Sequence, residues 1–111
     1  MQEEFPDPSE AQTQPEIERY YRNVEPGDPA AIRETQGQSL RFILTTVEAV
    51  HPKQGRVYLK KAPSWGGTTF YMKSGKNYGS PTGQSRLVIP TSEVRAFAEE
   101  HPRGQMWWSK G

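Results

Sequence analysis

The sequence predicts an α+β fold in which short N-terminal helices precede a four-stranded antiparallel meander and a C-terminal helix packs on the sheet. Three observations support this prediction. Helix caps and apolar residues at helical spacing occur between residues 13 and 38, strand-like segments follow from Ser39 onward, and a further capped helical pattern begins at Thr91. Because short connections favour antiparallel neighbours, we expect consecutive strands to pair, in a sheet that either stays open or curls into a small, partly open barrel.

The N-terminal residues 1–12 contain two prolines and four carboxylates but a single phenylalanine. Such a segment has too little apolar surface to offset the entropy that it would lose on ordering. We therefore expect a flexible acidic leader over 1–12, an N-terminal helical segment over 13–38, and a body of antiparallel sheet and C-terminal helix over 39–111.

The helical segment begins with a capping box, Thr13-x-x-Glu16, and has Pro15 in its first turn, where the missing N–H is not needed. A second short helix is expected over 29–36, with Asp28 as its cap and Gly37 at its end. Helical spacing places four apolar residues on one face of the first helix: Ile17, Tyr20, Tyr21 and Val24.

Four strands are expected in the body, at 40–50, 56–61, 68–73 and 86–89. The alternation of the first strand is interrupted near Thr45-Thr46, which predicts a bulge, and residues 51–55 read as a hairpin connection in which Gly55 can adopt positive φ. The residues expected to point into the core are Leu40, Phe42, Leu44, Val57, Leu59, Phe70 and Met72. A helix should follow from its cap Thr91 to about His101, with Val94, Phe97 and Ala98 toward the core.

The composition excludes several classes of protein. No cysteine occurs among the 111 residues, which excludes disulfides, thiolate zinc sites and cysteine nucleophiles. No apolar run approaches the roughly 20 residues of a membrane span, and the acidic start does not resemble a signal peptide. We therefore expect a single cytoplasmic domain that does not enter a membrane.

Charge is distributed unevenly along the chain. Residues 1–38 hold nine carboxylates and three arginines, a net charge of −6, whereas residues 39–90 hold eight lysines and arginines and one glutamate, a net charge of +7. A basic body behind an acidic segment indicates either an anionic partner for the body or attraction between the two parts.

The basic body also carries tyrosines on the face that the alternation turns away from the core. Arginines and lysines neutralise phosphates while tyrosine rings stack on bases, as in proteins that bind single-stranded nucleic acid on sheets and small barrels. The simpler interpretation is an ordinary solvated sheet face. The predicted nucleic-acid-binding residues are Arg41, Arg56, Tyr58, Lys60, Tyr71, Lys73 and Lys76, and Tyr78 of the following loop can extend the same face.

Two other classes of function remain open. A protein-interaction module, such as an inhibitor, an assembly component or a homo-oligomer, would use the acidic helices or the tail residues Met106, Trp107 and Trp108. An enzyme is not expected, because no aspartate follows Asp28 and no catalytic or metal-ligand spacing is recognisable. We expect no cofactor and no metal.

Overall fold

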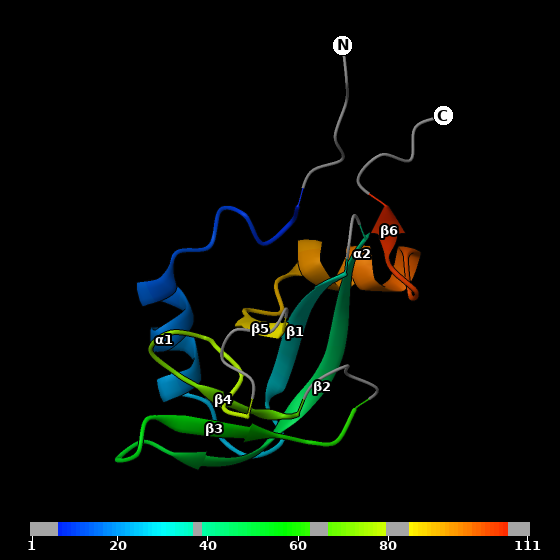
Figure 1. Cartoon of the computed structure of the whole chain (residues 1–111). Helices are drawn as coiled ribbons and strands as arrows, with labels where there is room; N and C mark the ends of the chain where they lie inside the picture. The colour runs from blue at the N-terminus through cyan, green and yellow to red at the C-terminus, as the bar shows by residue number, and fades with distance from the viewer. Residues whose placement is uncertain (1–6, 37–38, 63–66, 80–84, 107–111) are drawn as a thin grey trace.

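The computed structural model of the chain describes residues 7–36, 39–62, 67–79 and 85–106 and confirms the predicted α+β class (Figure 1). The elements follow the order α1 (Gln14–Arg22), β1 (Pro29–Gln36), β2 (Ser39–His51), β3 (Arg56–Leu59), β4 (Thr69–Tyr71), β5 (Ser85–Val88), α2 (Ser92–Glu100) and β6 (Gln105–Met106).

The strands form one curled antiparallel sheet in the order β4-β3-β2-β1-β5, and β6 pairs with the start of β2. The long strand β2 is shared, because its first part pairs with β1 and its last part with β3. Its register shifts between Val47 and Ala49, slightly beyond the bulge expected at Thr45-Thr46. A bulge increases local twist and bends the strand, so the sheet turns a corner at this point (Figure 1).

The predicted four-stranded meander is correct only for β2, β3 and β4, because β5 pairs with β1. The segment after β4 returns along the sheet and forms isolated bridges between Phe70 and Asn77 and between Lys76 and Arg86. In addition, the N–H of Leu87 donates to the carbonyl of Gly75 at 2.9 Å. These contacts bring the β4 end of the sheet beside β5.

The expected helix over 29–36 is wrong, because these residues form strand β1 between β2 and β5. The capping signal at Asp28 has a different use: its carboxylate accepts from the N–H of Glu25 at 2.9 Å and closes a turn before the strand. Ala30 and Ala31 have no strong strand preference of their own, but both are buried, and packing on both faces overrides propensity.

Within the expected leader, the described residues 7–12 lie against the sheet, and residues 1–6 lie outside the described residues. The side-chain amide of Gln12 donates to the carbonyl of Ile89 at 2.9 Å and accepts from its N–H at 2.8 Å. Asp7 forms an ion pair with Arg33 of β1 at 2.9 Å. Asp7 and Gln12 therefore fasten residues 7–12 to the sheet.

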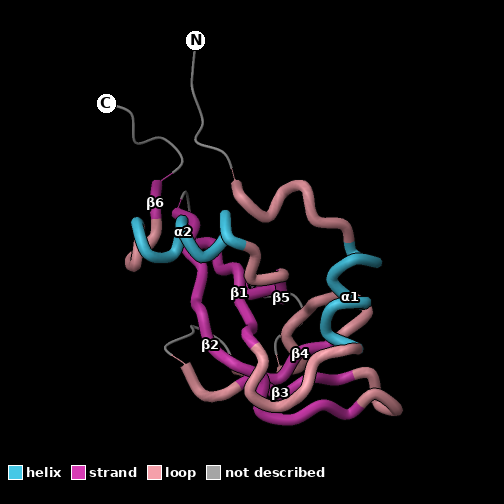
Figure 2. Tube along the Cα trace, turned by 180° about the vertical axis from the view of Figure 1, so that it is seen from behind, coloured by secondary structure: helices cyan, strands magenta, loops and turns pink. Residues whose placement is uncertain are grey.

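The two helices cover different faces of the sheet (Figure 2). The predicted caps are confirmed: Thr13 forms the capping box of α1 and Thr91 caps α2. Ile17 and Tyr21 of α1 pack in a cluster with Val57, Leu59, Phe70 and Met72. Val94 and Ala98 of α2 pack with Leu40 and Phe42 on the other face, whereas Leu44, expected inside, is 39% exposed.

Tyr21 connects α1 to the sheet through its hydroxyl group. The hydroxyl donates to the carbonyl of Val88 at 2.6 Å and accepts from the N–H of Ala31 at 3.1 Å. Since Ala31 and Val88 are partners in the register of β1 and β5, the hydroxyl bridges the two strands. Burial raises the pKa of this phenol above its ordinary value, an effect that the hydrogen bond from Ala31 partly offsets.

Candidate functional site

The outer face of β3 and β4 carries side chains of the predicted basic and aromatic type. Strand alternation buries Val57 and Leu59 of β3 and Phe70 of β4, as expected. Their neighbours Arg56, Tyr58 and Tyr71 therefore lie on the opposite face. The register pairs Arg56 with Tyr71, so side chains from the two strands are adjacent there.

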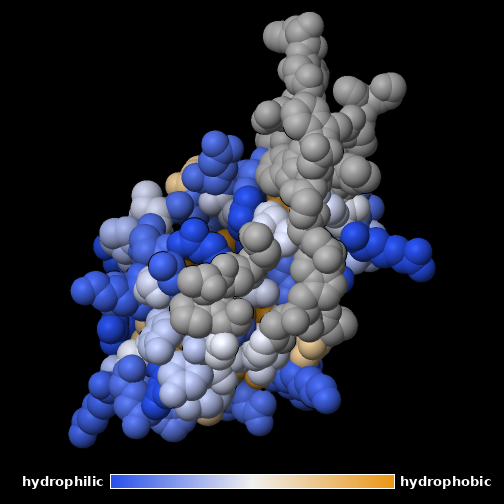
Figure 3. Space-filling view, in the orientation of Figure 1, coloured by the Kyte–Doolittle hydropathy of each residue, from blue (hydrophilic) through white to orange (hydrophobic). Residues whose placement is uncertain are grey.

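Ring contacts form two groups of side chains that the pairing of His51 with Arg56 places on neighbouring strand positions. We call this surface the tyrosine face; it consists of His51, Arg56, Tyr58, Tyr71 and Tyr78. The rings of His51 and Tyr58 meet edge-on with centroids 4.9 Å apart, and the Tyr71 and Tyr78 centroids are 5.5 Å apart. The Arg56 guanidinium carbon lies 4.7 Å from the Tyr78 ring centroid, within the range of a cation–π contact. In Figure 3 a pale area of intermediate hydropathy lies over β3 and β4 within a mostly hydrophilic surface.

A buried asparagine positions the part of this surface that follows β4. Asn77 is 1% exposed; its side chain donates to the carbonyl of Gly67 at 2.8 Å and accepts from the N–H of Gly79 at 2.9 Å. The N–H of Tyr78 donates to the carbonyl of Thr69 at 2.8 Å. With Asn77 inside, alternation turns Lys76 and Tyr78 outward, and Tyr78 is 46% exposed.

The structure brings together some of the predicted residues and separates others. Arg56, Tyr58 and Tyr71 share the face and Lys76 flanks it, whereas Lys60 is exposed just beyond the end of β3 and Lys73 is exposed in the turn after β4. The predicted place of Arg41 on this face is wrong. Its guanidinium forms an ion pair at 2.8 Å with Glu34, whose side chain is 0% exposed. Because Arg41 is committed to a buried carboxylate across the β1–β2 pair, it lies apart from the tyrosine face.

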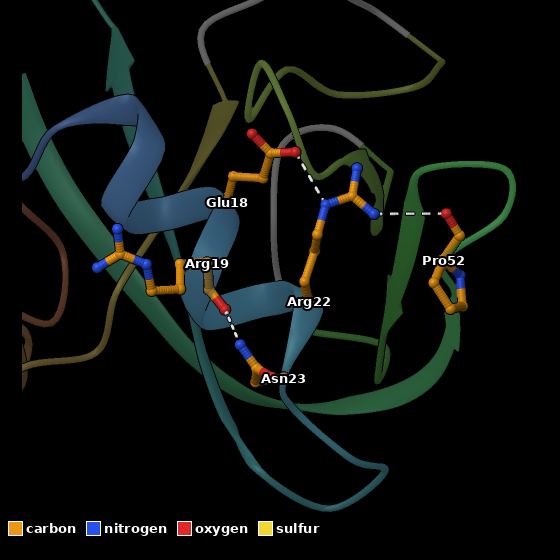
Figure 4. Close-up of polar contacts among 5 residues, drawn as sticks. All are labelled: Glu18, Arg19, Arg22, Asn23 and Pro52. Atoms are coloured by element: carbon orange, nitrogen blue, oxygen red, sulfur yellow. Dashed lines mark hydrogen bonds and ion pairs between the residues drawn. The ribbon is translucent and has the colours of Figure 1, made fainter.

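A hollow of about 430 Å³ adjoins the tyrosine face at Tyr71 and contains two basic residues that the sequence did not indicate, Arg22 and Lys53. Arg22 stands at the end of α1, where its Nε is 2.8 Å from a Glu18 oxygen and its Nη1 donates to the carbonyl of Pro52 at 3.4 Å (Figure 4). Only the tertiary fold brings α1 to this hairpin, so no local sequence signal could have identified the hollow.

The predicted interaction tail is only partly described. The backbone of Met106 pairs with Ser39 in the short β6–β2 ladder, whereas Trp107 and Trp108 lie outside the described residues. No helix among the residues that the structure describes has the length and apolar character needed to cross a membrane. In the same part of the chain, no group of three or more histidine, aspartate or glutamate side chains could hold a metal ion.

Comparison with known proteins adds no assignment: no protein-family model, no curated protein and no solved structure matches the chain. A functional conclusion therefore depends on the geometry and chemistry of the tyrosine face and of the hollow beside it.

Proposed function

We propose that this protein is a non-enzymatic accessory protein that binds single-stranded nucleic acid on the tyrosine face. The observation that carries the proposal is the continuous arrangement of Arg56, Tyr71 and Tyr78, in which one guanidinium and two rings are already in contact. Aromatic rings on an exposed sheet face can stack on unpaired bases, and nearby cations neutralise the phosphates.

The Arg56 side chain of the proposed face is held in place before any ligand binds. The Nη2 of Arg56 donates to the Gln54 side chain at 2.7 Å, and the guanidinium lies over Tyr78. Rigid side chains lose less entropy on binding than flexible ones. In the same proposal the curled sheet is a small, partly open barrel, an architecture that commonly presents one strand face to nucleic acid.

The charge distribution also suggests that the acidic N-terminal segment competes with nucleic acid for the basic face. We propose this role only for the carboxylates at the start of the segment, Glu3 and Glu4. Asp7 and Glu34 are engaged in ion pairs with Arg33 and Arg41, and β1 is an inner strand. Deleting residues 1–38 would therefore remove part of the sheet. The appropriate test replaces Glu3 and Glu4 by glutamine, which should tighten oligonucleotide binding if the segment competes.

Fluorescence anisotropy with labelled single- and double-stranded oligonucleotides tests the proposed function. We expect salt-sensitive binding with a preference for the single strand. The variant Tyr78→Ala should weaken this binding by roughly 5- to 150-fold, the range that corresponds to the loss of one stacked base. Leu44→Ala is the matched control, because Leu44 is also partly exposed but lies on the part of β2 that pairs with β1. Equal affinities of both variants and the unchanged protein would contradict the proposal.

The alternative proposal is a protein-interaction module that uses the acidic helices or the tail at Trp107 and Trp108. It becomes the leading proposal if no oligonucleotide binds, and it predicts that the mass measured by light scattering rises with protein concentration.

A further inference from the structure

We propose that the hollow beside the tyrosine face is a subsite for a backbone phosphate of the bound strand; this inference rests on the proposed function. The hollow is formed by the end of α1, the β2–β3 hairpin and the turn after β4. Among the described residues, its lining includes three cationic side chains and no carboxylate, and Glu18 pairs with Arg22 from outside this lining. The residues that line it are Arg22, Pro52, Lys53, Gln54, Gly55, Tyr71, Lys73 and Ser74.

Arg22 is fixed at the rim of the hollow by two contacts. The Nε of Arg22 donates to the Glu18 carboxylate, and its Nη1 donates to the carbonyl of Pro52 (Figure 4). A guanidinium has five N–H donors, so these two contacts orient the group without using all of its donors. The pair with Glu18 is between residues one helical turn apart, which makes the orientation a property of α1 itself.

The charges around the hollow favour an anionic occupant. Arg22, Lys53 and Lys73 come from three different segments, and the fold brings them to one opening. The pair with Glu18 offsets the charge of Arg22, and the two lysines leave a positive charge that an anion binding between the three side chains neutralises. A phosphate carries the negative charge and the acceptor oxygens that such an arrangement recognises.

Continuity with the tyrosine face identifies the source of the phosphate. Tyr71 lines the hollow and also contacts the Tyr78 ring on the tyrosine face. A strand with a base stacked on Tyr71 therefore passes the opening with its backbone. We take the occupant to be the sugar–phosphate backbone of that strand, and a free phosphate compound would use the same donors.

The salt dependence of binding tests this inference. Each phosphate contact in a single strand contributes about 0.7 to the slope of log K against log salt. One phosphate held in the hollow accounts for about 0.7 of this slope, so the triple variant Arg22→Gln/Lys53→Gln/Lys73→Gln should lower the slope by about 0.7 and weaken binding at 0.15 M salt by about 4-fold. The matched control Lys61→Gln/Arg95→Gln/Arg103→Gln removes the same charge from other exposed residues, and it should keep the slope of the unchanged protein within about 0.2.

A second measurement tests the hollow without an oligonucleotide. Inorganic pyrophosphate should cause saturable NMR shifts at the amides of Lys53, Lys73 and Ser74, and the triple variant should lose these shifts while keeping its circular dichroism spectrum and melting temperature.

The inference is overturned if pyrophosphate causes no saturable shift there, or if the triple variant keeps the salt slope of the unchanged protein. If Tyr78→Ala weakens binding while the triple variant does not, the proposed function stands and the subsite fails. If pyrophosphate binds but no oligonucleotide does, the proposed function fails and the strand is excluded as the occupant.

Discussion

The hydroxyl of Tyr21 offers a sharp test of how α1 is fastened to the sheet. The residue is 0% exposed, and its hydroxyl bridges the N–H of Ala31 and the carbonyl of Val88. The change Tyr21→Phe keeps the ring and its packing but removes both hydrogen bonds. A donor of β1 and an acceptor of β5 are then left without this partner inside the protein.

The loss of stability on this change comes from the two backbone groups that lose their partner, the N–H of Ala31 and the carbonyl of Val88. An unsatisfied buried polar group costs about 1–3 kcal/mol, and the closure of α1 on the sheet keeps water away from both. We expect Tyr21→Phe to lower the free energy of unfolding by roughly 2–4 kcal/mol. The control is Tyr20→Phe, whose hydroxyl donates to the carbonyl of Pro29 at 2.8 Å in an exposed position; there water can replace the lost partner, and the expected cost is about 0.5 kcal/mol.

Urea unfolding followed by tryptophan fluorescence measures both variants, and its pH dependence gives a second readout. Burial raises the folded-state pKa of Tyr21, so above about pH 10 the unfolded chain loses this proton while the folded protein keeps it. The contribution is fully present below pH 10 and is lost as the pH rises further, by up to about 1.4 kcal/mol per pH unit. Tyr21→Phe should remove this part of the alkaline slope. Equal costs for the two variants together with an unchanged alkaline slope would show that the Tyr21 hydroxyl does not bridge β1 and β5.

Two glycines and one buried ion pair also contribute to the stability of the fold. Gly104→Ala should cost about 2–4 kcal/mol, because φ is +97° and the added Cβ would lie 2.9 Å from the carbonyl oxygen of Leu40; Gly55→Ala, at φ +69° in open space, should cost only about 1 kcal/mol. Urea unfolding compares the two glycine variants, and a larger cost at Gly55 would contradict the backbone argument. Glu34→Ala should cost about 3–5 kcal/mol, because it leaves the guanidinium of Arg41 in a largely buried site without its carboxylate. A thermal melt of this variant within 2 °C of the unchanged protein would show that the ion pair contributes little.

Local signals in the sequence predicted the parts of the fold that local chemistry determines. The capping box at Thr13 and the cap at Thr91 place both helix starts correctly, since a cap involves residues only three positions apart. The hairpin at 51–55 was also predicted, and Gly55 has the positive φ that its turn requires. The alternation of apolar and polar residues identified Val57 and Leu59 as the buried residues of β3, because this pattern is also local in the sequence.

Features that depend on contacts between distant segments could not be read in this way. The stretch 29–36 is compatible with a helix by propensity, and only its pairing with β2 and β5 makes it a strand. The sequence predicted Arg41 to be a surface cation. Its partner Glu34 can be identified only when the register of β1 and β2 is known. Arg22 and the β2–β3 hairpin line the same hollow. No local pattern in either segment predicts that they meet.

We propose that the tyrosine face contacts the bases of a single strand, and NMR titration of the labelled protein with a short single-stranded oligonucleotide detects this contact at the rings themselves. We predict upfield shifts of the ring signals of Tyr58, Tyr71 and Tyr78, because stacked bases shield them, with little change at Tyr20 and Tyr21 of α1. Ring signals that stay unchanged at saturating oligonucleotide, or shifts confined to α1, would contradict the account.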